Sequence, residues 1–151
     1  MILALIPARL NSKRVPNKPL RRLGDKPIIG HVLQKALKSK KLDKIVVCVD
    51  DKKVANEVRK YGQESFMTNK NFKNGTERIA SYLKKNNSLN KKIKLVVDIQ
   101  CDEVFLKPKN LDKIIEFHLN NLNKYDVVIP HSITFDRNNK NYVKIISDKD
   151  C

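Results

Sequence analysis

Basic residues gather in the loop that directly follows the first apolar segment of the chain. The apolar segment is Ile2–Ile6, and the loop after it includes Arg9, Lys13, Arg14 and Lys18. Three prolines in this loop restrict φ, which lowers the entropic cost of holding the cations in place. A loop of this kind is preorganised for a polyphosphate, and we expect a nucleoside triphosphate to bind here.

A carboxylate follows a later apolar segment, at a position where it could ligate a metal ion. Asp102 lies just beyond Leu95–Ile99. Mg²⁺ is usually bound by one or two carboxylates together with substrate phosphates, and Asp102 is the candidate for that role. A turn former or a helix cap is the alternative interpretation. A further segment, Asn74–Arg78, opens a predicted helix, and a doubly wound sheet would bring all these segments to one cleft.

Apolar runs of strand length alternate along the chain with amphipathic stretches of helix length. This alternation predicts an α/β fold with a largely parallel sheet and helices on its faces. The predicted strands are Ile2–Ile6, Ile45–Val49, Leu95–Ile99, Val127–Ile129 and Val143–Ile146. The predicted helices are Pro27–Lys38, Asp51–Lys60, Thr76–Lys85 and Asn110–Asn120, with Asn110 as a candidate N-cap.

The connections and the end of the chain bear on domain organisation. The Lys/Asn-rich pieces Asn86–Lys92 and Asp136–Asn141 are predicted to be solvated connections, because they offer little apolar area for burial. No stretch has the composition of an interdomain linker, so residues 1–151 are expected to form a single nucleotide-binding domain. The chain stops soon after the last predicted strand, and we expect this domain to be incomplete at its C-terminus.

The overall composition favours some classes of binding partner over others. The net charge is +16, but 25 of the 32 basic residues are lysines spread along the whole chain. No aromatic-interleaved basic element is present, so small acidic substrates are favoured over nucleic acid. Cys48, Cys101 and Cys151 have no paired spacing, which favours a reducing cytoplasm over a disulfide framework or a zinc site. No apolar run approaches membrane-spanning length, and we expect no membrane association.

Five short motifs follow one another along the chain. They are Ile6-Pro7-Ala8-Arg9, Pro16-Asn17-Lys18-Pro19-Leu20, Gly24-Asp25-Lys26-Pro27-Ile28-Ile29-Gly30-His31-Val32, Gly75-Thr76-Glu77-Arg78 and Gln100-Cys101-Asp102-Glu103. In this order they resemble the sugar-acid cytidylyltransferases, most closely the 3-deoxy-manno-octulosonate (KDO) type. The resemblance runs nearly end to end, with a weaker later match at Tyr142–Asp148.

This resemblance implies a fold and an activity. The fold would be a three-layer, Rossmann-like nucleotidyltransferase fold of the nucleotide-diphospho-sugar transferase type. The reaction would transfer CMP from CTP to a hydroxyl of the eight-carbon sugar acid KDO, with release of pyrophosphate and dependence on Mg²⁺. The product would feed lipopolysaccharide synthesis, and full-length relatives would be homodimers.

The same resemblance assigns roles to individual residues. Arg9 and Lys18 would neutralise phosphate charge, and Asp102 would be the first of two aspartates that hold the metal. Attack on an α-phosphate builds negative charge on oxygens, so fixed cations and a hard metal suit this chemistry without a covalent nucleophile. Further contacts to nucleotide or sugar acid would come from Ala8, Ser12, Arg14, Arg78 and Gln100.

The resemblance also suggests roles for four neighbouring residues. Gly75 would let the backbone approach the base or ribose, and Thr76 would cap the helix. Glu103 would orient water around the metal. Asp50 resembles an aspartate at the edge of the family's cleft, although a helix cap explains it equally well.

The sequence departs from the family pattern in three respects. Cys101 and Val104 replace Gly and Pro of the usual Gln-Gly-Asp-Glu-Pro, and Cys101 would be strained if the turn requires positive φ. Asn17 replaces a commoner Gly, which is milder because Asn tolerates the left-handed region. The chain also covers only about three fifths of a typical family member. The segments expected to supply the second metal-binding aspartate would follow it, and this polypeptide alone is expected to be weak or inactive.

Three other functions stay open. The acceptor could be another sugar acid, such as an acylneuraminate or legionaminate. The chain could also be a nucleotide-binding remnant without activity, or a basic RNA-associated protein.

Overall fold

A parallel sheet forms the framework of the computed structural model, which describes residues 1–11 and 15–131. The sheet has four strands in the order β5-β4-β1-β6, and every neighbouring pair is parallel. The strands are β1 (Ile2–Ala8), β4 (Lys44–Val49), β5 (Glu64–Met67) and β6 (Leu95–Asp98). The predicted α/β fold is confirmed, with β1 in the interior of the sheet.

Helices connect these strands, and a small hairpin precedes the first helix. The helices are η1 (Lys18–Leu20, a 3-10 turn), α1 (Ile28–Ala36), α2 (Lys52–Arg59), α3 (Gly75–Lys85), α4 (Asn87–Asn90) and α5 (Pro108–Asn120). The hairpin pairs β2 (Arg22–Leu23) with β3 (Lys26–Pro27). None of the helices among the described residues is both long and apolar enough to cross a membrane.

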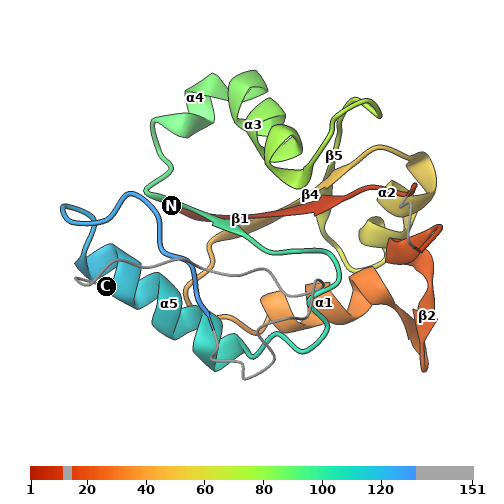
Figure 1. Cartoon of the computed structure of the whole chain (residues 1–151), viewed down its shortest axis with the longest axis horizontal. Coiled ribbons are helices and arrows are strands. Elements are labelled where there is room, and N and C mark those ends of the chain that lie inside the picture. The colour runs from red at the N-terminus through yellow and green to blue at the C-terminus, as the bar shows by residue number, and fades with distance from the viewer. Residues whose placement is uncertain (12–14, 132–151) are drawn as a thin grey trace, which may run out of the picture.

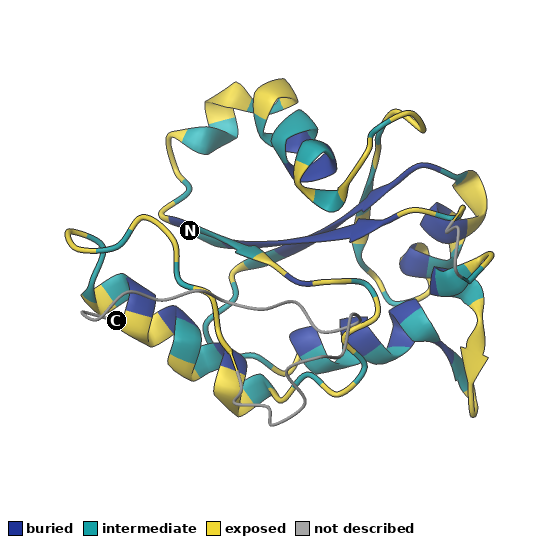
Figure 2. Ribbon diagram, in the orientation of Figure 1, coloured by how far each residue is buried: buried dark blue, intermediate teal, exposed yellow. Residues whose placement is uncertain are grey.

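Two apolar clusters, one on each face of the sheet, make the fold three-layered. Alternate side chains of a strand point to opposite faces, so Ala4 and Ile6 of β1 join the cluster under α1, α2 and α5. Leu3 and Leu5 join the cluster under α3. Figure 1 shows α3 and α4 on one side of the sheet and α1 and α5 on the other, and Figure 2 shows β1 and β4 buried between them.

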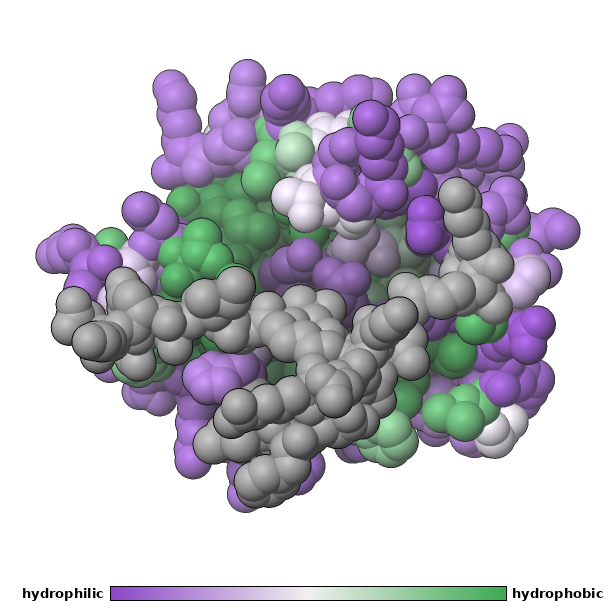
Figure 3. Space-filling model, viewed as in Figure 1, coloured by the Kyte–Doolittle hydropathy of each residue, from purple (hydrophilic) through white to green (hydrophobic). Residues whose placement is uncertain are grey.

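Hydrophilic side chains surround the apolar ones on the face of the molecule drawn in Figure 3. Figure 3 shows them around the periphery of the face seen in this view, with apolar side chains exposed between them. This distribution agrees with a chain in which charged residues make up 32% of the sequence.

Two sequence-based predictions about secondary structure are wrong. Val127–Ile129 was expected to be a strand, but it pairs with no described strand, and Val127 and Ile129 are 71% and 66% exposed. Without a hydrogen-bonded neighbour, an extended apolar run gains little from strand geometry. The piece Asn86–Lys92 was expected to be a connection, but it contains the short helix α4, whose Leu89 packs against the cluster under α3.

One further boundary differs from expectation, and one strand was missed. α5 begins at Pro108 after Lys107, so Asn110 is inside the helix and is not its N-cap. Proline is favoured at the first helical position because its missing N–H would be unpaired there anyway. The apolar pattern does not predict β5, because this short edge strand is only half-buried. The expected strand Val143–Ile146, the connection Asp136–Asn141 and the motif Tyr142–Asp148 lie outside the described residues.

Gly30 is the point of closest contact between α1 and the end of α2. The buried residues of α1 include Ile29, Val32 and Leu33, which form one apolar stripe at helical spacing. A β-carbon built on Gly30 would lie 2.1 Å from the hydroxyl oxygen of Tyr61 and 2.6 Å from its Cζ. Glycine at this position therefore leaves room for the hydroxyl end of the Tyr61 ring against the helix.

We therefore predict that Gly30→Ala destabilises the protein by about 1 to 3 kcal/mol, the usual cost of overpacking a core contact. Urea unfolding followed by circular dichroism measures the change. In a Tyr61→Ala background the same substitution should be neutral or slightly stabilising, because alanine has the higher helix propensity. An equal loss in both backgrounds would contradict this account of Gly30.

Asp112 joins α5 to the loop between α1 and β4. Its Oδ1 accepts hydrogen bonds from the Ser39 hydroxyl and from the Lys40 backbone N–H. Partial burial acts to raise the pKa of Asp112, but these hydrogen bonds and the charge of Lys41 outweigh it and lower the pKa below the usual 3.8.

A lowered pKa predicts a specific pH dependence for Asp112→Asn. The charged form contributes stability above the unfolded pKa near 3.8, and this contribution is lost as pH falls through the lower folded pKa. We expect the substitution to cost about 0.5 to 1 kcal/mol at neutral pH, since the group is partly exposed, and the difference to shrink below about pH 4. Unfolding curves at a series of pH values test this, and a difference that grows in acid would refute it.

Candidate nucleotide-binding site

The carboxyl ends of the parallel strands bring the predicted site residues to one edge of the sheet. β1 and β4 are paired to their last residues, with Ala8 opposite Val49, and β6 is paired with β1 up to Asp98. The chain therefore leaves these strands at Arg9, Asp50 and Ile99 on the same edge. Ligands of open α/β sheets bind beyond this edge.

Lys18 and Asp102, which are 84 residues apart in the sequence, are in direct contact at this edge. The Nζ of Lys18 donates a hydrogen bond to Oδ2 of Asp102, and the two side chains are 32% and 41% exposed. Lys18 begins the turn η1, and Asn17 before it has φ 55° and ψ 29°. The expectation that Asn17 tolerates the left-handed region is thus confirmed.

The Cys101 thiol is influenced by the charges of Asp102, Lys18 and Arg9. Burial, together with the charge of Asp102, raises the pKa of Cys101 to about 11. The charges of Lys18 and Arg9 both oppose this rise in pKa. Arg9 itself is exposed. The Lys18–Asp102 contact therefore brings the basic loop next to the segment after β6, as the sequence predicts for one shared cleft.

The structure places the other predicted contact residues in different environments. The side chain of Ala8 is 0% exposed and belongs to the apolar cluster under α1, so only its backbone faces the site edge. Gln100 is exposed, and its Nε2 donates to Oδ1 of Asp98 at 2.9 Å. Ser12 and Arg14 lie outside the described residues.

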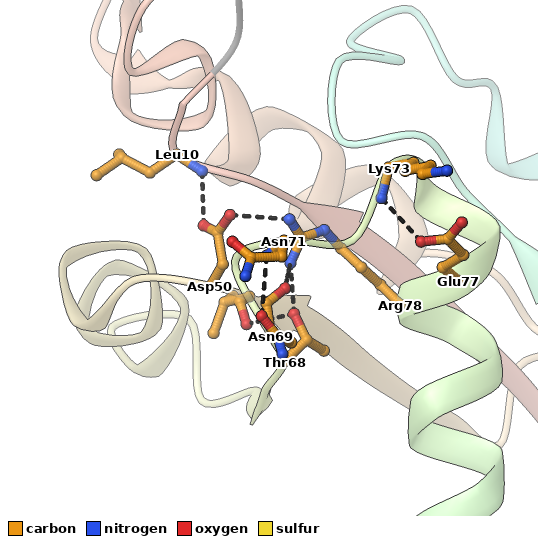
Figure 4. A network of polar contacts seen from close by, with 9 residues as sticks. Leu10, Asp50, Thr68, Asn69, Asn71, Lys73, Glu77 and Arg78 are labelled. Carbon is orange, nitrogen blue, oxygen red and sulfur yellow. Dashed lines mark hydrogen bonds and ion pairs between the residues drawn. The ribbon is translucent and has the colours of Figure 1, made fainter.

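Arg78 lies inside the protein and is 1% exposed. Its Nη2 donates to Oδ2 of Asp50 at 2.9 Å, and its Nη1 donates to the Thr68 hydroxyl at 2.5 Å and to the Asn69 carbonyl at 3.1 Å. Figure 4 shows Arg78 reaching from α3 to this group of acceptors, with Leu10 on the far side of Asp50. The contact of Arg78 with a nucleotide stays a prediction, but its partners in this structure are protein groups.

Asp50 does not cap a helix, which was the alternative to its resemblance to an aspartate at the edge of the family's cleft. The N-cap of α2 is the next residue, Asp51, whose side chain accepts from the Lys53 N–H. Asp50 instead uses its Oδ1 to accept the Leu10 N–H at 2.8 Å, while Oδ2 binds Arg78. Adjacent aspartates at the end of β4 thus have different structural roles, which the sequence alone does not separate.

The start of α3 corrects one expectation and gives Gly75 a packing role. Thr76 was expected to cap the helix, but the N-cap is Asn74, whose Oδ1 accepts from the Glu77 N–H at 2.9 Å. A β-carbon on Gly75 would lie 2.9 Å from Cγ of Pro7. The close approach that Gly75 allows is therefore to the end of β1.

Residues that the sequence analysis missed also line the site edge. A depression of about 80 Å³ is lined by Arg9, Leu10, Asn11, Asp50, Asp51 and Lys70. Lys70 follows β5, and because that strand was not predicted, its loop was not placed beside the basic residues. The volume is below the ~300 Å³ of small ligand sites, so the depression holds only part of a nucleotide. A larger hollow of about 480 Å³ lies at the opposite edge and is lined by none of the predicted site residues.

The described residues offer a limited donor set for a metal ion. No group of three or more His, Cys, Asp or Glu side chains within residues 1–11 and 15–131 is arranged to hold one. Mg²⁺ keeps several waters and binds proteins through one or two carboxylates with substrate phosphates. The partly exposed carboxylate of Asp102, beside the cations, fits such a site as a single protein ligand.

Cys101 has an ordinary backbone conformation, since it is not among the described residues with positive φ. The strain that was considered for the Gly-to-Cys departure is therefore absent. The Cys101 side chain is half-buried and packs against the cluster under α1.

We accordingly predict that Cys101→Gly, which restores the usual family residue, destabilises the protein by about 1 kcal/mol. Glycine gains more freedom in the unfolded chain than a residue with a side chain, and the packed thiol is lost. Chemical denaturation measures the change, with Cys101→Ala as the matched control that keeps a β-carbon. A gain in stability for the glycine variant would show that the turn does disfavour a side chain.

Comparison with known proteins places this geometry in a family. A family profile described as "Cytidylyltransferase" matches residues 3–150. Among curated proteins, the 3-deoxy-manno-octulosonate cytidylyltransferase of Thermodesulfovibrio yellowstonii is 33% identical over 151 residues, covering 97% of this chain and 59% of that protein. The protein of the same name from Pasteurella multocida is 36% identical, covering 95% of this chain and 55% of that protein. The chain thus spans less than two thirds of the length of these relatives.

Solved structures show the same fold. A structure titled CMP:2-keto-3-deoxy-manno-octonic acid synthetase complexed with CTP matches with a TM-score of 0.70 and 27% identity, covering 80% of this chain and 48% of that one. A cytidylyltransferase from Leptospira borgpetersenii matches with a TM-score of 0.67 and 27% identity, covering 80% and 49%. The profile match across residues 3–150, together with these structures, shows that this chain belongs to the cytidylyltransferase family.

Proposed function

We propose that this protein binds CTP and transfers CMP to a hydroxyl of a sugar acid, releasing pyrophosphate, with KDO as the acceptor. The observation that carries the proposal is the contact between Lys18 and Asp102 at the ligand-binding edge of the sheet, where Arg9 also follows the end of β1. Support for KDO comes from the names of relatives that are 33% and 36% identical. Support for CTP comes from the related structure whose title names that nucleotide.

Positive charge is the main requirement of this reaction. Attack on the α-phosphate increases negative charge on the nonbridging oxygens and on the departing pyrophosphate, and preorganised cations stabilise that charge. Arg9 would bind the triphosphate with its planar guanidinium, which matches the spacing of phosphate oxygens. Lys18 would act as a point charge beside it.

Asp102 is the residue that would hold Mg²⁺. When bound, the ion supplies further positive charge at the phosphate oxygens. The Asp102 carboxylate also keeps Lys18 directed toward the site edge before nucleotide binds.

The Lys18–Asp102 ion pair is weak enough for each side chain to exchange its partner for a ligand. Both side chains are about a third or more exposed, and an exposed pair of this kind contributes only ~0 to 1 kcal/mol. Binding of a magnesium nucleotide can therefore separate the pair at little cost, so that Lys18 reaches phosphate and Asp102 reaches the metal. A buried pair would oppose this step by several kcal/mol.

The sugar-acid acceptor would bind beside the nucleotide. Gln100 would contact the sugar acid, and its hydrogen bond to Asp98 directs the amide nitrogen back toward β6 and so leaves the amide oxygen free to accept. An acylneuraminate or legionaminate acceptor is the second candidate, and it uses the same nucleotide chemistry.

We predict that pyrophosphate release requires CTP, Mg²⁺ and KDO, and that Lys18→Met and Asp102→Asn each lower its rate at least about 100-fold, as loss of a charge-stabilising group does. Lys44→Met is the matched control, because Lys44 is 31% exposed and pairs with Glu64 at 2.9 Å at the opposite edge of the sheet. Adding EDTA should abolish turnover.

The outcomes separate the competing functions. Release with another sugar acid instead of KDO would move the assignment to that acceptor. CTP binding by calorimetry without pyrophosphate release would indicate a nucleotide-binding remnant. Full activity of Lys18→Met or Asp102→Asn would refute the roles proposed for these residues.

A further inference from the structure

A buried ion pair links four segments of the protein at the site edge. Asp50 follows β4, and Arg78 lies in the first turns of α3. Asp50 also binds the backbone N–H of Leu10, which follows Arg9. Arg78 also binds Thr68 and Asn69, at the end of β5. The pair therefore joins the segments after β1, β4 and β5 to α3, as Figure 4 shows.

Both charged groups are buried and hydrogen-bonded within the protein. The side chains of Arg78 and Asp50 are 2% and 8% exposed. Arg78 donates hydrogen bonds to Asp50, Thr68 and Asn69. The two carboxylate oxygens of Asp50 accept from Arg78 and from the Leu10 N–H. A buried charge is tolerated only when it is paired and hydrogen-bonded, so releasing Arg78 to bind a nucleotide would leave Asp50 buried and unpaired.

The Leu10 hydrogen bond lies just beyond the point where the pairing of β1 with β4 ends. The ladder between β1 and β4 ends at Ala8 and Val49. Arg9 comes next, and the 2.8 Å bond from the Leu10 N–H to Asp50 fixes the backbone on the other side of Arg9. The conformation of the backbone that carries Arg9 thus depends on a carboxylate held by Arg78.

We infer that Arg78 and Asp50 are positioning residues for the triphosphate site: Arg78 fixes Asp50, and Asp50 fixes the Leu10 amide and through it the backbone at Arg9. This inference rests on the proposed function, because it assumes that Arg9 binds the phosphates of CTP. It differs from a direct contact of Arg78 with the nucleotide, since the effect of Arg78 passes through Asp50. Removing the Asp50 charge should therefore weaken CTP binding even though Arg78 is still present.

Asp50→Asn is the most informative substitution because of the donors that surround this side chain. Both neighbours, Arg78 and the Leu10 N–H, are donors, whereas asparagine has one acceptor oxygen and one donor nitrogen. The charged guanidinium needs the oxygen more, because an unsatisfied buried charge costs more than an unsatisfied amide. The asparagine nitrogen then faces the Leu10 N–H, and that hydrogen bond is lost.

The test measures the Leu10 amide and CTP affinity separately. In Asp50→Asn, we expect hydrogen exchange of the Leu10 amide, followed by NMR, to accelerate at least tenfold relative to the amide of Val46 in β4. CTP affinity measured by calorimetry with Mg²⁺ should fall about tenfold. Asp112→Asn is the matched control, because Asp112 also accepts backbone hydrogen bonds but lies away from the site. It should change neither the ratio of exchange rates nor the affinity.

The double variant Asp50→Leu/Arg78→Met separates positioning from stability. Replacing both members of a buried pair by apolar residues often preserves the fold, whereas removing one member does not. We expect the double variant to unfold cooperatively near the wild-type midpoint and still to bind CTP about tenfold more weakly. If it does not fold, the two readouts on Asp50→Asn decide the question.

Two results would overturn the inference. One is an unchanged exchange rate of the Leu10 amide in Asp50→Asn, which would show that Asp50 does not hold this segment. The other is unchanged CTP affinity despite faster exchange, which would show that the contact is structural only. A wild-type protein with no measurable CTP affinity would instead refute the proposed function, and the exchange experiment would still decide whether Asp50 holds Leu10.

Discussion

The parallel pairing of β1 on both sides is the constraint on which the candidate site depends. Because β4 and β6 run in the same direction as β1, the residues that follow all these strands emerge at one edge. Arg9, Asp50 and Asp102 come from segments that are far apart in the sequence, and only this register brings them together. The apolar side chains of β1 that alternate between the two clusters keep the strand in register, because a shift by one residue would exchange its two faces.

Two ion pairs at this edge differ in burial, and the difference suits them to different tasks. Arg78 and Asp50 are almost completely buried, so their separation carries the cost of an unpaired charge in the interior. Lys18 and Asp102 are partly exposed, so water can replace either partner cheaply. The buried pair is therefore suited to holding the backbone, and the exposed pair is suited to exchanging its partners for a ligand. Geometry alone, without burial, would not separate these roles.

The sequence predicts the parts of this structure that depend on local patterns. The continuous apolar runs at β1, β4 and β6 indicate buried strands. The basic loop that follows β1 and the Asp102 carboxylate that follows β6 indicate a shared cleft. β5 escapes prediction because its stability comes from pairing with β4 and not from a run of apolar residues. The burial of Arg78 also escapes prediction, because it depends on Asp50, 28 residues away in the sequence. The strand expected at Val127–Ile129 was wrong for the converse reason, since this apolar segment pairs with no strand among residues 1–11 and 15–131.

Resemblance and structure give different kinds of information about the same residues. The family pattern identifies Arg78 by its place in a motif, whereas its contacts show that its hydrogen bonds go to Asp50, Thr68 and Asn69. The pattern likewise marks Cys101 as a departure, yet the turn accepts it because φ there is not positive. A motif thus indicates which positions are worth inspecting, and burial and hydrogen-bond partners decide what each side chain can do. For Arg78 they favour an effect on the nucleotide that is transmitted through Asp50 and the Leu10 amide.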